Sequence, residues 1–287
     1  MTNKANEREK EALEKYLLQF LNIEKRFPLL PGIKNSEAIA GLMGLDVSEL
    51  LSLRGNFKEN AKKASLELLK DDDVIDWMDQ LPFESNNTIV AIGDSSTDDL
   101  QGWFEIFKYI LDLTIPEADF NFINSGISNN TTTDALRRMN RDVLSHEPDW
   151  VIVSLGTFDA QSLKYSPNRT LIPLSESWEN LTIIEDAIGT VTENPPIWIT
   201  PSPVIPELLD NMELFEFTIQ NRDLANVREI ITGKKGYIVD PVGRRMGNPP
   251  EAWYYLSDGL NASLSGHVNT VKELLRSLAT SKVQNGK

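Results

Sequence analysis

Apolar and polar positions follow two different patterns along the chain, and the two patterns meet near residue 86. Before that point, apolar residues recur three and four positions apart among charged residues, which is the spacing of amphipathic helices. The segments with this spacing are 6–27, 35–57 and 56–83, and the acidic run 71–73 divides the last one into two helices. Because no strand pattern occurs there, residues 1–85 are predicted to form a helical N-terminal extension.

From residue 87 onward, short runs rich in Val and Ile alternate with amphipathic segments. Buried strands separated by helices are typical of a parallel sheet covered on both faces. The predicted strands are 87–93, 119–126, 149–156, 195–200 and 236–240. The predicted helices are 98–113, 131–146, 175–191, 206–233 and 263–281, with a long loop at 162–175. The sequence therefore predicts a three-layer α/β/α domain over residues 86–287.

Composition excludes several classes of function. The chain has no cysteine and two histidines, His146 and His267, which excludes disulfides, thiolate nucleophiles and metal centres built from several histidines. We expect no metal and no cofactor. The net charge of −15 disfavours nucleic acid and anionic membrane surfaces as partners. No apolar run approaches the roughly 20 residues of a membrane span, and the polar N-terminus does not resemble a signal peptide, so we expect a cytoplasmic protein.

Candidate chemistry lies just after the strands, because doubly wound sheets bind ligands beyond the C-terminal ends of their strands. In "IGDSSTDDL", Ser95 follows the first strand near a predicted helix N-terminus, where free N–H groups favour negative charge. Such a place suits a nucleophile whose attack creates an oxyanion, although the sequence around Ser95 taken alone favours a simple helix cap. In "NSGISNNTTTD", the N–H of Gly126 is a candidate donor to the same oxyanion, or part of an ordinary glycine turn.

Two further segments carry side chains that bear on this chemistry. In "LGTFDA", Phe158 stands where a polar donor would be useful, and its ring cannot donate a hydrogen bond. In "SDGLNASLSGH", Asp258 is suited to orienting a base, and Asn261 is suited to the place of that base but has no useful pKa. The same residues also fit a turn at Asp258-Gly259 and a cap on the last helix.

In their order along the chain, these four segments resemble the sequence blocks of the SGNH (GDSL-type) hydrolases. That family contains esterases and acylhydrolases with a Ser-His-Asp site on a flavodoxin-like, five-stranded parallel sheet, and the resemblance spans most of residues 87–280. It implies that Ser95 is the nucleophile and that Asp258 orients the catalytic base. It also implies that the backbone N–H groups of Ser95 and Gly126 form part of the oxyanion hole.

The resemblance fails at two functional side chains. The family's oxyanion-hole asparagine falls on Phe158, and its catalytic histidine falls on Asn261. General-base assistance contributes about 10²–10⁴ in rate, and an oxyanion-hole donor about 10²–10³. We therefore expect a hydrolase of short acyl or acetyl esters with weakened or altered activity. The alternative is an inactive homologue that binds a ligand or another protein.

Other residues near the site are weaker candidates for the missing base. His267 lies six residues after Asn261 and is expected to pack in the last helix rather than to replace the missing base. His146 precedes the third strand, at the opposite end of the sheet, and is expected to be structural. Asp98 and Asp159 lie nearer the site, but a carboxylate is a poor base unless burial raises its pKa. The residues expected to contact the substrate are Asp94, Asn130 and Asp159.

The N-terminal segment "AIAGLMGLDVSELLSLRGN" has the rhythm of small residues found in a helix-turn-helix. Acidic residues outnumber basic ones over residues 1–85, which favours ordinary helical packing over DNA recognition. We expect this extension to pack on the hydrolase-like domain or to form the contact of a homodimer.

Overall fold

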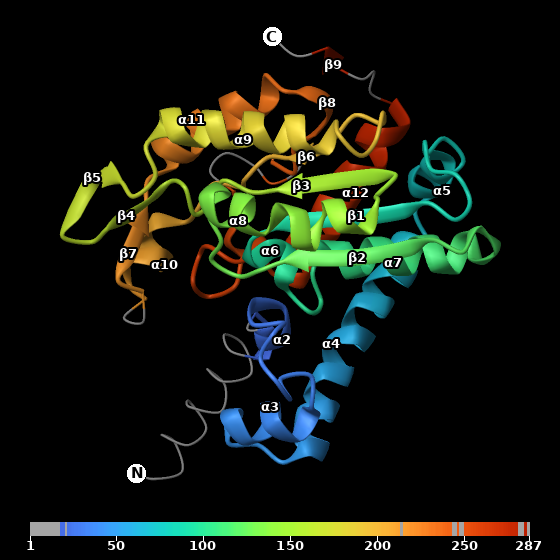
Figure 1. The fold of residues 1–287 in the computed structure, drawn as a ribbon, viewed down its shortest axis with the longest axis horizontal. Helices are drawn as coiled ribbons and strands as arrows, with labels where there is room; N and C mark the ends of the chain where they lie inside the picture. Colours follow the sequence, from blue (N-terminus) through green and yellow to red (C-terminus); the bar gives the residue numbers. More distant parts are fainter. Residues whose placement is uncertain are drawn as a thin grey trace.

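Five parallel strands form the centre of the molecule in a computed structural model, in the order β2-β1-β3-β6-β8 (Figure 1). They are β1 (Thr88–Gly93), β2 (Asn121–Gly126), β3 (Trp150–Ser154), β6 (Ile197–Ile199) and β8 (Lys235–Val239). A short strand, β9 (Gln284–Asn285), pairs antiparallel with β8. The structure describes residues 18–20, 22–212, 215–242, 246, 250–280 and 284–285. The predicted five-stranded parallel sheet is confirmed.

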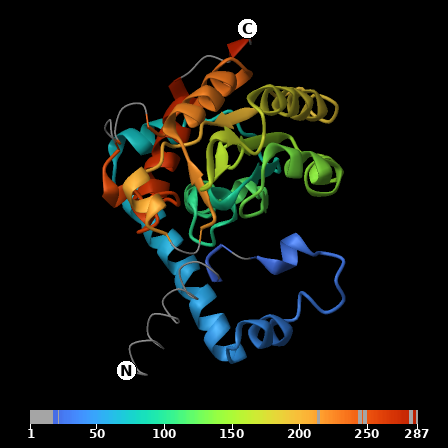
Figure 2. The ribbon, with the colours of Figure 1, turned by 90° about the vertical axis from the view of Figure 1, so that its left-hand side faces the viewer.

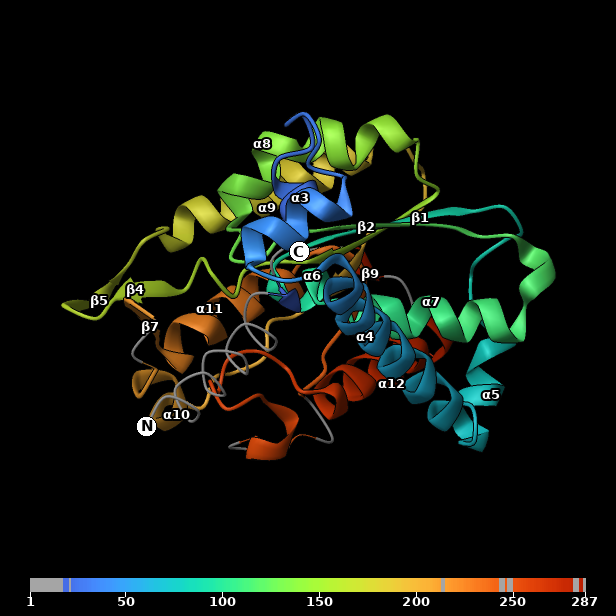
Figure 3. The same ribbon diagram turned by 90° about the horizontal axis from the view of Figure 1, so that it is seen from below.

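Helices cover both faces of this sheet and make a three-layer fold (Figure 3). One face carries α8 (Thr132–Asp142), α9 (Leu174–Ile188) and α11 (Asn221–Thr232). The other face carries α7 (Trp103–Thr114) and α12 (Leu264–Thr280), with α4 (Val47–Leu68) and α5 (Asp72–Met78) packed outside them. The short helices are α2 (Ile23–Arg26), α3 (Ser36–Met43), α6 (Ser95–Asp98), α10 (Pro206–Asp210), η2 (Pro116–Ala118), η3 (Leu144–His146) and η4 (Ala252–Tyr254).

Alternation along the strands explains why both faces are covered. In β1, Val90 and Ile92 pack in the core beneath α8 and α9, whereas Ile89 and Ala91 pack in the core beneath α7 and α12. Successive side chains of a strand point to opposite faces, so a continuous apolar run must be buried on both. Among the described residues, no helix is long and apolar enough to cross a membrane.

The segment 206–233 differs from the single long helix predicted for it. It contains α10, the strand β7 (Phe217–Ile219) and then α11. Its residues Phe215, Phe217 and Ile219 alternate with polar ones, and this period of two favours a strand over a helix. The strand pairs antiparallel with β4 (Gln161–Leu163), which pairs with β5 (Ser166–Thr170), so the predicted loop at 162–175 is a hairpin in a small second sheet.

The described part of the N-terminal extension consists of helices joined by turns (Figure 2), and residues 6–17 of the first predicted helix lie outside the described residues. Gly44, with φ of 68°, ends α3 where a single helix was predicted over 35–57. The end of α4 and all of α5 join the main core through Ala61, Leu68, Val74 and Met78. The extension thus packs against the helices and sheet of the rest of the chain, which was one of the two expectations. The other expectation, a homodimer contact, stays a prediction.

The short helix α6 lies directly against the ends of β1 and β2. A Cβ atom at Gly93 would stand 2.1 Å from Thr97 Oγ1, and one at Gly126 would stand 2.5 Å from the backbone N of Asp98. Gly93 and Gly126 are paired in register, so both lie at the C-terminal edge of the sheet. Glycine at these two positions therefore allows α6 to approach the strand ends closely.

Gly126→Ala is expected to destabilise the protein by about 1–3 kcal/mol, because the new methyl group must displace backbone atoms of α6. Urea unfolding followed by circular dichroism measures this change. Gly41→Ala in α3 is the matched control, since a Cβ there meets open space, and its stability should be unchanged or slightly raised. Equal effects of the two substitutions would show that α6 does not require glycine beneath it.

Candidate active site

A cavity of about 60 Å³ lies at the C-terminal edge of the sheet, at the start of α6. A cavity needs roughly 10–15 Å³ per enclosed water, so this one has room for a small group of a few atoms. Its wall brings together side chains from five parts of the chain that are far apart in sequence. Those that matter for chemistry are Asp94, Ser95, Thr157, Phe158, Asn261 and His267.

Ser95 is the first residue of α6 and is 4% exposed. Asp94 caps this helix by accepting a hydrogen bond from the N–H of Ser96, with an N···O distance of 3.1 Å. The Oγ of Ser95 accepts a hydrogen bond from the backbone N–H of Asn129, also at 3.1 Å. The N–H of Ser95 has no acceptor within α6, because the first N–H groups of a helix precede its hydrogen-bond ladder. Two backbone donors therefore lie beside the hydroxyl.

The N–H of Gly126, expected in the oxyanion hole, points elsewhere. It donates to Oδ1 of Asn124 at 3.0 Å, and Gly126 does not line the cavity. The donor next to Ser95 is instead Asn129, whose φ of 63° turns its N–H toward the hydroxyl. Sequence reasoning missed Asn129. Its only signal was the Asn-Asn pair in "SNN", because asparagine tolerates the left-handed conformation better than most residues.

Asp258 and Asn261 form a tight turn at the cavity mouth, as the sequence indicated. Asp258 is fully buried and accepts three hydrogen bonds at 2.8 Å, from the N–H groups of Leu260 and Asn261 and from Nδ2 of Asn261. Burial raises the pKa of Asp258, and these hydrogen bonds partly oppose that rise. The Asn261 amide is thus held by Asp258 in the manner expected for an oriented base, but it has no proton-accepting nitrogen.

Phe158 lies in the cavity wall and is 2% exposed. Its ring packs edge-on against Phe217 of β7, with 6.2 Å between the ring centroids. The small second sheet therefore anchors this side chain beside Ser95, and the site receives an apolar surface where a hydrogen-bond donor would be useful.

The other two expected substrate contacts, Asn130 and Asp159, lie outside this cavity. Asn130 accepts from Nε of Arg138 at 2.8 Å. Asp159 accepts from the N–H and hydroxyl of Thr132 at 2.8 and 2.7 Å, and burial raises its pKa. Asp159 thus holds the start of α8 and Asn130 binds a side chain farther along it, and their contact with substrate stays a prediction.

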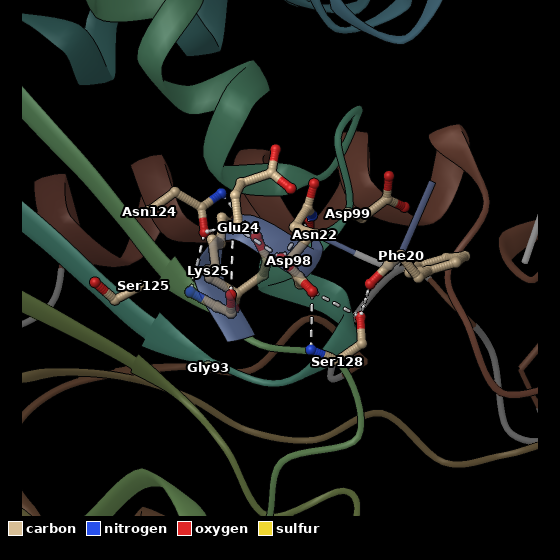
Figure 4. Close-up of polar contacts among 12 residues, drawn as sticks. Phe20, Asn22, Glu24, Lys25, Gly93, Asp98, Asp99, Asn124, Ser125 and Ser128 are labelled. Atoms are coloured by element: carbon tan, nitrogen blue, oxygen red, sulfur yellow. Dashed lines mark hydrogen bonds and ion pairs between the residues drawn. The ribbon is translucent and has the colours of Figure 1, made fainter. Parts of the chain in front are cut away.

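Asp98 is buried at the end of α6 and is bound by the N-terminal extension (Figure 4). Its Oδ1 contacts Nζ of Lys25 at 2.9 Å and Nδ2 of Asn22 at 2.7 Å. Its Oδ2 accepts from the N–H and the hydroxyl of Ser128, both at 2.9 Å. Because both of its carboxylate oxygens already accept hydrogen bonds from these donors, Asp98 is poorly placed to accept a proton from Ser95.

His267 is on the first turn of α12, buried to 1% exposure as a packing residue would be. Its Nε2 lies 2.9 Å from Oδ2 of Asp99, which is itself fully buried. The same oxygen accepts from Nε2 of Gln19 at 2.7 Å. Among the described residues, no cluster of three or more His, Cys, Asp or Glu side chains could hold a metal ion.

Comparison with known proteins gives the chain's relatives. A sequence model of the GDSL-like lipase/acylhydrolase family matches residues 91–269. An acetylxylan esterase of Geobacillus stearothermophilus is 30% identical over 89 residues, and an uncharacterised lipoprotein of Bacillus subtilis is 33% identical over 85 residues. Each match covers 26% of this chain, and the chain spans 41% and 33% of the lengths of these two relatives.

Solved structures share the fold. An α/β hydrolase from the metagenome of Lake Arreo matches with a TM-score of 0.55 at 19% identity, over 68% of this chain and 96% of its own. The Geobacillus stearothermophilus acetylxylan esterase gives 0.52 at 21% identity, over 70% and 98%. A lipase/acylhydrolase from Enterococcus faecalis gives 0.53 at 21% identity, over 70% and 99%. At these identities the similarity establishes the architecture.

Asp94→Asn tests the electrostatics of the site. Burial raises the pKa of Asp94 from 3.8 to about 6. Between about pH 4 and pH 6 the folded protein therefore retains a proton that the unfolded chain releases, so stability falls as pH rises. Two pKa units correspond to about 3 kcal/mol, and wild type should lose about this much more stability than Asp94→Asn. Urea unfolding at several pH values measures the difference, and a pH-independent difference would contradict the shift.

Proposed function

Because this chain belongs to the GDSL-like lipase/acylhydrolase family, we propose that it hydrolyses esters of short acyl groups with Ser95 as the nucleophile. One observation carries this proposal. The Ser95 hydroxyl lies in a small cavity, at a helix N-terminus and 3.1 Å from the backbone N of Asn129. Backbone N–H groups at such a place stabilise the negative charge that develops on an attacked carbonyl oxygen.

The proposed reaction has two halves. Ser95 Oγ attacks the ester carbonyl carbon, its proton passes to a base, and the carbonyl oxygen becomes an oxyanion held by the N–H groups of Ser95 and Asn129. The carbon–oxygen bond to the alcohol then breaks, and the alcohol leaves with the proton. Water attacks the acyl-enzyme in the same way and releases the acid and Ser95.

A short acyl group, such as acetyl, is the proposed substrate class. A cavity of about 60 Å³ beside Ser95 suits a short acyl group, and Phe158 presents an apolar surface suited to a methyl group. The relative named an acetylxylan esterase supports the same class. We propose further that turnover is slow, because Phe158 offers no oxyanion donor and Asn261 offers no base.

Ser95→Ala should abolish hydrolysis of short nitrophenyl esters, since it removes the nucleophile and leaves the cavity otherwise intact. The assay compares kcat/KM of wild type and variant, and Ser96→Ala is the matched control on the neighbouring hydroxyl. If the two enzymes hydrolyse the ester equally well, Ser95 is not the nucleophile. If wild type itself shows no turnover, the inactive homologue that binds a ligand becomes the better description.

Asn261→His should raise kcat at least about tenfold, because the new imidazole can donate to Asp258 where the Asn261 amide does now, and general-base assistance is worth about 10²–10⁴. Adding Phe158→Asn should raise it again by restoring an oxyanion donor. That second change removes the contact with Phe217, so its thermal stability is measured in parallel. A folded double variant with unchanged kcat would contradict the assigned positions.

A further inference from the structure

A buried aspartate–histidine pair, Asp99 and His267, lies at the cavity through His267, apart from the Asp258–Asn261 pair. Nε2 of His267 lies 2.9 Å from Oδ2 of Asp99, with 1% and 0% of their side chains exposed. Asp99 is the residue directly after α6, and His267 is on α12. The contact between them therefore connects the end of α6 to the first turn of α12. His267 lines that cavity together with Ser95.

The hydrogen bonds of Asp99 determine which ring nitrogen of His267 carries the proton. Oδ2 of Asp99 accepts from Nε2 of Gln19 at 2.7 Å, and Oδ1 accepts from the N–H of Gln101 at 2.9 Å. Asp99 thus acts as an acceptor on both oxygens, so the facing Nε2 of His267 carries the proton. In the neutral imidazole this leaves Nδ1 as the proton-accepting atom. In the part of the chain that the structure describes, no hydrogen bond to Nδ1 is formed.

Asp94 also lines the cavity, and its Oδ1 accepts from the N–H of Ser96 as the cap of α6. Two further carboxylates near Ser95, Asp98 and Asp258, are fully engaged. Asp98 is bound by Lys25 and Ser128, and Asp258 by Asn261 and its own turn. Neither Asp98 nor Asp258 lines the cavity. Within the described residues, His267 is therefore the one imidazole on the cavity wall that Ser95 shares.

We propose that His267 is the proton acceptor of this site, in place of the histidine that Asn261 replaces, and that Asp99 positions it. This inference rests on the proposed function, since it requires Ser95 to be the nucleophile. The cavity that Ser95 and His267 both line has room for a few water molecules, and in the proposed mechanism one of them bridges the two side chains. The Ser95 proton passes through that water to Nδ1 of His267 as Oγ bonds to the ester carbonyl carbon. Nδ1 then returns a proton to the departing alcohol as the carbon–oxygen bond breaks.

Gln19 extends this arrangement into the N-terminal segment. Its side chain donates to the Asp99 oxygen that holds His267, and its carbonyl accepts from the N–H of Leu100. Gln19 is 3% exposed, so the contact is sheltered from water. Gln19 and Asp99 are positioning residues, because they act on the reaction only through the imidazole.

The test compares kcat and KM on short nitrophenyl esters for wild type, Ser95→Ala and His267→Gln. Glutamine keeps a donor to Asp99 but has no proton-accepting nitrogen. We expect His267→Gln to lower kcat at least about tenfold with little change in KM, and to slow the labelling of Ser95 by a fluorophosphonate. His146→Gln is the matched control, because His146 is exposed at the opposite end of the sheet and should leave kcat unchanged.

Rescue separates loss of a base from loss of structure. Adding Asn261→His to His267→Gln should restore kcat at least to the wild-type level, which a merely misfolded site would not allow. Asp99→Asn is the second variant, and should lower kcat without moving KM because asparagine no longer holds the same tautomer. If Ser95→Ala abolishes turnover while His267→Gln retains it, the inference is overturned and the Ser95 function stands. If wild type has no turnover that depends on Ser95, the proposed function itself fails.

Discussion

The close packing of α6 on the ends of β1 and β2 is the constraint on which the rest of the site depends. Gly93 and Gly126 are paired across these strands, and neither position has space for a Cβ atom. With α6 pressed against the strand ends, its first residue, Ser95, reaches the cavity and the N–H of Asn129. A side chain at either glycine would lift the helix and separate the hydroxyl from its donor.

This packing also buries three carboxylates, Asp94, Asp98 and Asp99, none of them more than 2% exposed. Burying a charge is costly unless partners compensate, and each of the three is compensated differently. Asp98 has an ion pair with Lys25. Asp99 is held by Gln19 and His267. Asp94 keeps the cap of α6, and burial raises its pKa to about 6.

The strands, the turns and the family could be predicted because short continuous segments of the sequence carry the signal for each of them. The five-stranded parallel sheet and the family membership were both confirmed. The helix prediction over 206–233 was wrong because the alternating Phe-Glu-Phe-Thr-Ile run is short and lies between two helical patterns. Asn129 was missed because its role comes from one left-handed residue, and Gln19 because its partner Asp99 is 80 residues away in sequence. Such long-range contacts leave no local pattern.

The contacts of Gln19 link two departures of this chain from its relatives. The solved structures are matched over 96–99% of their lengths by 68–70% of this chain, and the family match begins at residue 91. The N-terminal segment thus lies outside the family match, and it reaches Asp98 and Asp99 at the end of α6. If His267 is the proton acceptor, the added segment supplies part of its support through Gln19. A base at position 261 needs only Asp258, three residues earlier in the same turn. A base at position 267 needs Asp99, the residue after α6, which Gln19 of the N-terminal segment holds in place. Loss of histidine at 261 and gain of the N-terminal segment would then be two parts of one rearrangement.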